Sequence, residues 1–426
     1  MTNESSPTPA GSSRFPWVWL AGVFVVVLGI VAGAVAIDVS GSSGTASASP
    51  SGSVAPSEVA LASATPTLAT TPAPTPTGTA QPTPSPSPTL VAAPLTGLLV
   101  TPKAAQQHPI AVMIDDHVLA RPQAGFNAAS IVWQAPAEGG IPRYMLIFQD
   151  QVPASVGPVR SSREYFIEWA TEWNAMYVHA GGSSQALATL AAKGHGQWVW
   201  NADDFRWEGK YLFRVHEVKV LGGATYPLVP PHNVYTDGVH LRQLAAKIGA
   251  ADGPLSAHWA FGPDAPLSYR PSGTRITVAY PYEAIQYRYD RATNTYRRYI
   301  KPPWGGDFKP QIDAADGRQV APTNVVILRM GFGPLYPVGT DPHHRLEAND
   351  VGHGVAWISS NGVTVKGTWR KASVTAPTLL FGPDGQPISL APGQTFVQVM
   401  QLSDLVTIKA GTVVRSAPMG AMPDPR

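Results

Sequence analysis

Cysteine is absent from the 426-residue chain. This excludes disulfide bonds, zinc sites with thiolate ligands, thiol catalysis and a lipid-modified cysteine. His216-Glu217 lacks the second histidine of a zincin, and the chain has neither a Gly-x-Ser-x-Gly elbow nor a phosphate-binding loop ending in Gly-Lys-Ser/Thr. The Ser-x-x-Lys and Lys-Thr-Gly motifs of penicillin-binding enzymes are missing as well. The sequence therefore predicts no cofactor and no metal site, and an enzyme is the less favoured class.

Charge of either sign is sparse. The chain has 30 Lys and Arg against 28 Asp and Glu, so its formal net charge is +2, and the basic residues form no long run. Proteins that bind nucleic acid usually carry a dense basic patch or stripe. No nucleic-acid partner is therefore expected.

Residues 17–37 form an uncharged apolar run with two tryptophans at its leading edge. A run of this length spans the hydrocarbon core of a bilayer, and tryptophan favours the interface. Arg14 precedes the run and no Lys or Arg follows it before Lys103, which predicts a cytoplasmic tail over residues 1–16 and an extracytoplasmic remainder. The alternative is a secretory signal peptide cleaved near Ala36, which also places the remainder outside the cytoplasm.

Residues 38–93 consist mainly of Ser, Thr, Pro, Ala and Gly. Such a segment has too little apolar surface to offset its chain entropy, and its alternating prolines favour local polyproline II structure. We expect a disordered linker that holds the folded part away from the membrane.

Residues 94–251 alternate strand-like and helix-like segments, the pattern of an α/β domain with a layered, mixed sheet. Strands are expected over residues 110–114, 131–134, 144–148 and 175–180, and helices over residues 162–174 and 184–193.

The expected helix at residue 162 has a start signal and a buried stripe. Ser161 and Glu164 have the spacing of a capping box. Tyr165, Trp169 and Trp173 recur every four residues, which favours a core face over a ligand platform.

Residues 254–426 are rich in strand-like segments and predict a smaller, mostly β domain. Asn361-Gly362 is a strong signal for a two-residue hairpin, and Asp384-Gly385 predicts another turn. Strands are expected over residues 276–280, 285–289, 296–300, 324–328, 355–359, 363–369 and 395–400.

Arg160 and Arg163 stand at the expected helix N-terminus, in the segment Gly-Pro-Val-Arg-Ser-Ser-Arg. A helix N-terminus carries partial positive charge and unpaired N–H groups, so a cation there is unfavourable unless an anion faces it. The pattern calls for a carboxylate of the same protein or for an anionic ligand.

Polar loops follow the expected strands at their carboxyl ends, where α/β sheets collect ligand sites. Gly181-Gly182, just before a helix, is a candidate anion cradle. Asp115 and Asp116 have two interpretations of equal weight. They line a ligand site, or they pair with arginines of the same protein: Arg121, Arg143, Arg160 or Arg163.

Three further features have a structural interpretation beside a functional one. His179 on an apolar strand favours a hydrogen-bonded core histidine over an acid or base, and His343-His344 favours a solvated turn over a metal site. The aromatic segment 198–207 fits a sugar-stacking surface and a flap over the core equally well.

Taken together, the segments resemble the YerB-like family of bacterial envelope proteins, a family of unknown function. The resemblance runs in order from about residue 94 to residue 400. It rests on Pro94-Leu95-Thr96-Gly97, Pro109 to Asp115 with His117, Ala120 to Gly125, Glu138 to Ile141 with Arg143, Gly157 to Arg163, Tyr177 to Ser183, Pro231-His232-Asn233, Gly352-His353-Gly354 and Thr368 to Lys371. It implies a two-domain extracytoplasmic protein with an α/β N-terminal part. Many members are lipoproteins, whereas this chain lacks the cysteine and would use the apolar run as its anchor.

The favoured hypothesis is a membrane-anchored binding or regulatory module that recognises an anionic wall polymer or an envelope protein, because arginine suits carboxylate and phosphate groups. The alternative is an enzyme acting on a wall polymer or a polyprenyl-phosphate-linked glycan, with Asp115, Asp116 and His179 as catalytic candidates. The candidate ligand-binding residues are Arg121, Glu138, Arg143, Arg160, Ser161, Arg163, Gly181, Gly182, Ser183, His232 and Asn233.

Overall fold

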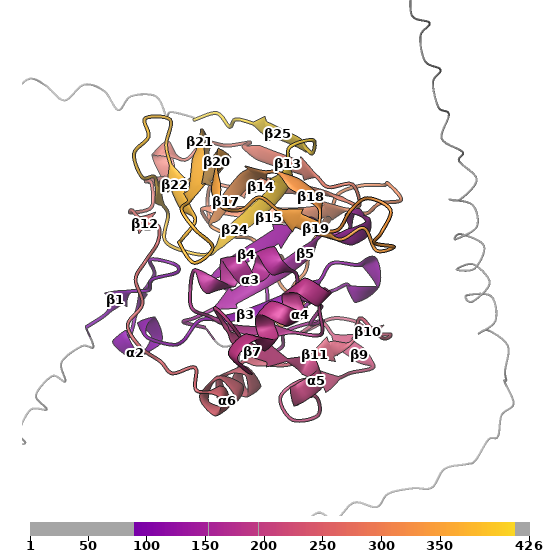
Figure 1. Ribbon diagram of the computed structural model, residues 1–426. Coiled ribbons are helices and arrows are strands. Elements are labelled where there is room, and N and C mark those ends of the chain that lie inside the picture. The colour runs from indigo at the N-terminus through magenta and orange to yellow at the C-terminus, as the bar shows by residue number, and fades with distance from the viewer. Residues whose placement is uncertain (1–88, 152, 195, 414–426) are drawn as a thin grey trace, which may run out of the picture. The chain divides into compact units, whose positions relative to one another are not determined.

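A ten-stranded mixed sheet runs through both halves of the chain in the computed structural model, which describes residues 89–151, 153–194 and 196–413 (Figure 1). In spatial order the strands are β22 (Leu379–Phe381), β21 (Val363–Lys371), β20 (Gly352–Ser360), β17 (Asn324–Met330), β24 (Thr395–Gln401), β4 (Ile131–Ala135), β5 (Arg143–Phe148), β3 (Ile110–Asp115), β6 (Met176–His179) and β7 (Trp200–Asp203). The expected mixed sheet and each strand expected from the sequence are present, within one to three residues at their ends.

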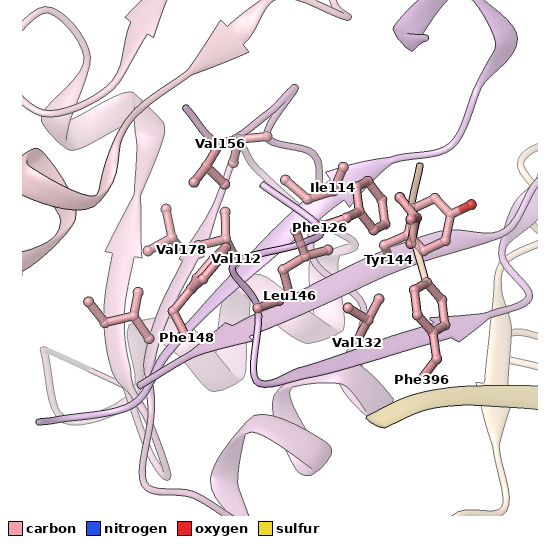
Figure 2. Packing of buried hydrophobic residues seen from close by; sticks show 14 of the residues in the cluster. Val112, Ile114, Phe126, Val132, Tyr144, Leu146, Phe148, Val156, Val178 and Phe396 are labelled. Carbon is pink, nitrogen blue, oxygen red and sulfur yellow. The ribbon is translucent and has the colours of Figure 1, made fainter. Parts of the chain in front are cut away.

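The two halves meet inside this sheet. Strand β24 pairs in parallel with β17 on one side and with β4 on the other, so that Phe396 lies opposite Val132. Figure 2 shows Phe396 beside Phe126 and Tyr144, and its ring centroid lies 6.3 Å from each of theirs. The chain has two domains in sequence, and they share one sheet and one core.

Two helices from the first half cover one face of the sheet, α3 (Glu164–Thr171) and α4 (Ser184–Ala191). The stripe of Tyr165, Trp169 and Trp173 is buried as predicted. Trp169 stacks on Trp133 of β4 with ring centroids 4.7 Å apart. Burial of one such side chain contributes about 1.5–3 kcal/mol, so the stripe fixes α3 against the sheet.

A second, antiparallel sheet of five strands and the helix α6 (Gly238–Ile248) contribute to the core on the opposite face. Asp237 caps the start of helix α6, where its carboxylate accepts from the His240 amide at 2.9 Å, and Gly249, in the left-handed conformation, caps the end. In spatial order the five strands are β16 (Lys309–Pro310), β15 (Thr295–Lys301), β14 (Ala284–Asp290), β13 (Arg275–Ala279) and β25 (Leu405–Lys409).

Short elements complete the described part. They are β1 (Val91–Ala92), β2 (Leu99–Val100), α2 (Pro102–Ala105), η1 (Val118–Ala120), η2 (Glu138–Gly140), η3 (Ala192–Gly194), α5 (Asp204–Trp207), β8 (Phe213–Arg214), β9 (Glu217–Lys219), β10 (Thr225–Pro227), β11 (Val234–Tyr235), β12 (Ala260–Phe261), η4 (Leu267–Tyr269), β18 (Phe332–Pro334), β19 (Leu346–Ala348) and β23 (Ser389–Leu390).

The predicted capping box is wrong. Helix α3 begins at Glu164, so the residue at its N-cap position is Arg163, which makes no side-chain capping bond. Ser162 is extended and bridges to Gly182, and Glu164 instead accepts from the Thr189 hydroxyl at 2.7 Å. Pairing with the neighbouring loop has replaced the first turn of the expected helix.

The expected hairpin at Asn361-Gly362 is confirmed. Both residues have positive φ, 52° and 77°, and connect β20 to β21. Such paired left-handed residues match the twist of a two-residue hairpin.

Most of the N-terminal predictions fall outside the described residues. These are the tail, the apolar run and the linker up to residue 88. The linker prediction extends too far, because Val91–Ala92 already pairs with Leu99–Val100. Within the described ranges, no helix has both the length and the apolar character needed to cross a bilayer.

Candidate functional site

Asp115 at the carboxyl end of β3 is the centre of a polar cluster. Its Oδ2 accepts from His232 Nδ1 at 2.7 Å and lies 3.2 Å from Arg160 Nε, while Oδ1 accepts from the His117 amide at 3.0 Å. Burial would raise the pKa of this carboxyl, but the hydrogen bond from His232 and the charge of Arg160 outweigh burial and lower the pKa. Asp115 is therefore ionised at neutral pH.

Arg160 reaches Asp115 because its backbone lies between β3 and β6. Its N–H donates to the Met113 carbonyl at 2.9 Å, and its carbonyl accepts from the Ala180 amide at 3.0 Å. The guanidinium uses Nε for Asp115, and no other group among the described residues bonds to its two terminal nitrogens. Its side chain is 25% exposed. Arg160 thus keeps the N–H groups of two nitrogens available to a ligand.

Two imidazoles lie beside this guanidinium. The rings of His117 and His232 stack with centroids 4.8 Å apart and an interplanar angle of 14°. His117 Nδ1 accepts from the Leu119 amide at 3.2 Å, which assigns the proton of its neutral ring to Nε2. Burial lowers the pKa of His117, and the neighbouring His232 lowers it further. We call Asp115, His117, Arg160 and His232 the Arg160 cluster.

Asp116, the next residue, belongs to a different network on the opposite face of the sheet. Arg121 bonds Asp116 Oδ1 at 2.7 Å and also bonds Glu283, and Gln134 donates to Asp116 at 2.7 Å and to Glu283 at 3.1 Å. Burial raises the pKa of Asp116 well above its ordinary value, and the negative charge of Glu283 adds to the effect. Arg298 completes the network through Gln134 at 2.6 Å.

This Asp116 network joins the two halves and is buried except at Arg121, whose side chain is 19% exposed. Asp116, Gln134 and Arg298 are each 0% exposed. For Asp116 and Arg121, the structure therefore agrees with the interpretation that arginines of the same protein hold the carboxylates.

Glu138 lies between Arg143 and Arg163. It bonds Arg163 through both carboxylate oxygens and accepts from Arg143 Nη2 at 3.3 Å. Arg143 also donates to the Ser161 carbonyl at 2.8 Å, and burial lowers the pKa of Arg143 to about 10. The anion that the sequence required at the start of α3 is thus an internal carboxylate.

The expected anion cradle at Gly181-Gly182 also bonds to groups of the protein itself. The Gly181 amide donates to Asp203 Oδ1 at 3.2 Å, and Ser183 caps α4 by accepting from the Ala186 amide at 3.3 Å. Gly182 pairs with Ser162 in a parallel bridge. These groups hold the loop in place and present no free array of N–H groups to the Arg160 cluster.

His179 and Asn233 have structural partners. His179 is 0% exposed, and its two ring nitrogens contact the Gly181 carbonyl at 2.9 Å and the Asn201 side chain at 2.8 Å. Asn233 donates to the Val215 carbonyl at 3.2 Å. The interpretation of His179 as a hydrogen-bonded core histidine agrees with these contacts.

Three participants were not among the sequence-based site residues. The sequence could have identified His117 as a site residue, because it directly follows the Asp115-Asp116 pair. No feature of the sequence identifies Glu283 or Arg298, since both come from the second half and reach the Asp116 network only through the tertiary fold. In the described ranges, no group of three or more His, Asp or Glu residues has the spacing to hold a metal ion.

Comparison with known proteins gives concordant matches. Residues 95–251 match the family model for the N-terminal domain of DUF3048, a protein family of unknown function. Residues 276–397 match the model for the C-terminal domain of the same family. The chain is 28% identical over 327 residues to YerB of Bacillus subtilis (strain 168), which is named as a lipoprotein, over 75% of this chain and 89% of that protein. A crystal structure of YerB from Bacillus subtilis superposes with a TM-score of 0.60 at 25% identity, over 75% of this chain and 99% of that one.

Proposed function

This chain belongs to the YerB-like two-domain family, and from that premise we propose that it is an extracytoplasmic envelope protein that binds an anionic group at the Arg160 cluster. The name of the Bacillus relative as a lipoprotein supports a place at the outer side of a membrane. Here the apolar run over residues 17–37 would serve as the single-pass anchor, with residues 38–88 as the spacer.

One observation carries the binding proposal. Arg121 uses Nη2 for the buried carboxylates of Asp116 and Glu283. Arg163 uses Nη2 for the half-buried Glu138, and Arg143 uses Nη1 for a carbonyl and Nη2 for Glu138. Arg160 instead forms an ion pair with Asp115 through Nε, and its terminal nitrogens have no partner among the described residues. Two N–H groups in a planar fork match the two oxygens of a carboxylate or phosphate.

The surroundings of Arg160 favour a modest affinity at neutral pH. Asp115 balances the charge of Arg160, so attraction would come mainly from directional hydrogen bonds. His117 Nε2, which carries the proton of the neutral ring, would add a donor. The proposed partner is accordingly an anionic wall polymer or an envelope protein that presents repeated carboxylate or phosphate groups, because repeats raise a weak single-site affinity.

The test is a salt-dependent binding measurement with the full-length protein. We expect binding to a phosphate-bearing wall polymer to weaken as salt rises, and Arg160→Gln to weaken it about tenfold. Arg318→Gln is the matched control, since its side chain is 77% exposed and pairs with Asp316. Equal affinities for Arg160→Gln and wild type would refute the assignment of the site.

A second candidate, an enzyme acting on a wall polymer or a polyprenyl-phosphate-linked glycan, is favoured by the Asp115–His232 contact. An ionised carboxylate on Nδ1 orients an imidazole so that Nε2 can take up a proton, as in catalytic Asp–His pairs. In this version Asp115 is a positioning residue, His232 replaces His179 as the acid or base, and Asp116 takes no part. Turnover of a wall glycan that is lost in His232→Gln and retained in His179→Gln would establish it.

A further inference from the structure

Two ring nitrogens of the Arg160 cluster have opposite hydrogen-bonding character. His117 Nδ1 accepts from the Leu119 amide, so Nε2 of this ring, when neutral, carries the proton and donates. His232 Nδ1 donates to the ionised Asp115, so Nε2 of this second ring, when neutral, has a free lone pair and accepts. Since the two rings stack with centroids 4.8 Å apart, one small molecule can meet both the donor and the acceptor.

These atoms are open to solvent. Nε2 of His117, Nε2 of His232 and the terminal nitrogens of Arg160 have no hydrogen-bond partner among the described residues, and none of them is among the buried polar atoms that lack one. His232 as a whole is only 7% exposed, so the small part of it that reaches solvent includes Nε2. A ligand can therefore contact the donors and the acceptor directly.

Contacts from both halves of the chain hold these groups in place. Oδ2 of Asp115 contacts His232 Nδ1 at 2.7 Å and Arg160 Nε at 3.2 Å, so a single oxygen fixes the imidazole beside the guanidinium. The ring of His117 also stacks with Tyr282 from the second half, with centroids 6.1 Å apart and an interplanar angle of 26°. Groups that are fixed before a ligand arrives lose less entropy when it binds.

We propose that the Arg160 cluster binds a phosphate ester that carries a hydroxyl on the neighbouring carbon, the unit of a polyol phosphate. This inference rests on the proposed function and names the class of its ligand. The terminal nitrogens of Arg160 would bond two phosphate oxygens in the forked arrangement. His117 Nε2 would donate to a third oxygen, which a phosphate has and a carboxylate lacks.

The acceptor separates this site from a simple anion site. An ionised acid without a hydroxyl has only acceptors, so it cannot bond to the lone pair of His232 Nε2 and is repelled by it. A hydroxyl next to the phosphate would donate to that nitrogen and replace the repulsion with a hydrogen bond. The cluster should therefore select for the hydroxyl as well as for the charge.

The test compares two phosphate esters of equal charge and carbon number, glycerol phosphate and n-propyl phosphate. Each is titrated into the full-length protein by calorimetry at pH 8, where histidine side chains are generally neutral. We expect glycerol phosphate to bind about fivefold more tightly than propyl phosphate, the value of one net hydrogen bond. Glycerate, which has the hydroxyls but a carboxylate in place of the phosphate, should bind more weakly than glycerol phosphate.

Three variants assign the contacts. In His232→Asn the amide N–H replaces Nδ1 as the donor to Asp115, but nothing replaces Nε2, so the two esters should bind equally. Arg160→Gln should weaken both esters about tenfold and keep the preference between them. His240→Asn is the matched control, because His240 contacts Asp237 through Nδ1 at 2.7 Å outside the Arg160 cluster, and it should bind as wild type.

Equal affinities of the wild type for the two esters would overturn this inference and leave Arg160-dependent anion binding in place. A preference that persists in His232→Asn, or glycerate bound as tightly as glycerol phosphate, would overturn it as well. If Arg160→Gln binds both esters as tightly as wild type, the proposed function fails and the inference fails with it. Melting temperatures show whether each variant is folded, and if His232→Asn is not, the comparison of the two esters in the wild type still decides.

Discussion

His232 donates from Nδ1 to Oδ2 of Asp115 at 2.7 Å across 117 positions of the sequence. The contact ties the loop before β11 to the carboxyl end of β3, next to Arg160. It gives the site a fixed arrangement in which one carboxylate orients an imidazole and a guanidinium together.

Asp115→Asn should destabilise the protein by about 1.5–3 kcal/mol at neutral pH, because it weakens hydrogen bonds between charged groups. The folded-state pKa of Asp115 lies below its ordinary 3.8, so this stabilisation is present above pH 3.8 and is lost as pH falls below that value. Urea unfolding of both proteins between pH 3 and 7 measures the difference. Asp307→Asn, at an exposed position, is the control and should be neutral. A difference that stays constant down to pH 3 would contradict the assignment.

Binding of a sulfated polymer, which stays ionised in acid, should strengthen as pH falls through the pKa of His117. That pKa is lowered from its ordinary value of 6.5, chiefly by burial, so the ring is neutral at pH 7 and gains its charge only below pH 6.5. An anion beside Arg160 favours the charged ring. Titrations of wild type and His117→Gln with dextran sulfate at pH 5, 6 and 7 measure this. A pH dependence that persists in His117→Gln would assign the effect to another group.

Lys371→Met should cost about 3–5 kcal/mol, because it leaves the carboxylate of Glu172 buried without its counter-charge. Lys371 Nζ lies 2.8 Å from Glu172, and both side chains are almost fully buried. Thermal and urea unfolding measure the loss, and Lys366→Met, exposed on the same strand, is the matched control. The double variant Lys371→Met with Glu172→Gln should recover part of the stability. No recovery would mean that packing, and not charge, causes the loss.

Gly362→Ala should destabilise by about 2–4 kcal/mol through two effects. Its φ of 77° is strained for alanine, and an added Cβ would collide with the ring of Tyr289. Gly385→Ala separates the two effects, since its φ is 75° and nothing lies within 4 Å of the added Cβ. This control should lose only about 1–2 kcal/mol in urea unfolding. Equal losses at the two positions would show that the collision is relieved by movement of Tyr289.

Local pattern predicted the strands of the central sheet well, since a buried run such as residues 110–114 is apolar throughout and bounded by turn residues. It failed where a tertiary contact overrides a local signal. Ser161 and Glu164 have the spacing of a cap, yet pairing of Ser162 with Gly182 keeps that segment extended. Helix α6 and strand β7 were not predicted at all.

The same limit applies to the site. The sequence predicted Asp115 as a catalytic candidate and Arg160 and His232 as ligand-binding residues, and the structure brings these three together. The sequence pattern could not show which arginines already pair with a carboxylate of the protein, because that carboxylate can lie far along the chain. Arg121 and Glu283, for example, are separated by 162 positions.

Strand β24, near the end of the described chain, lies in the middle of the ten-stranded sheet between β17 and β4. While the protein is being made from its N-terminus, β4 therefore keeps an unpaired edge until residues 395–401 are added. Such an edge is prone to pair with other chains. Completion of the fold must wait for nearly the whole polypeptide, so a chain cut between the two family regions would aggregate rather than yield two working halves.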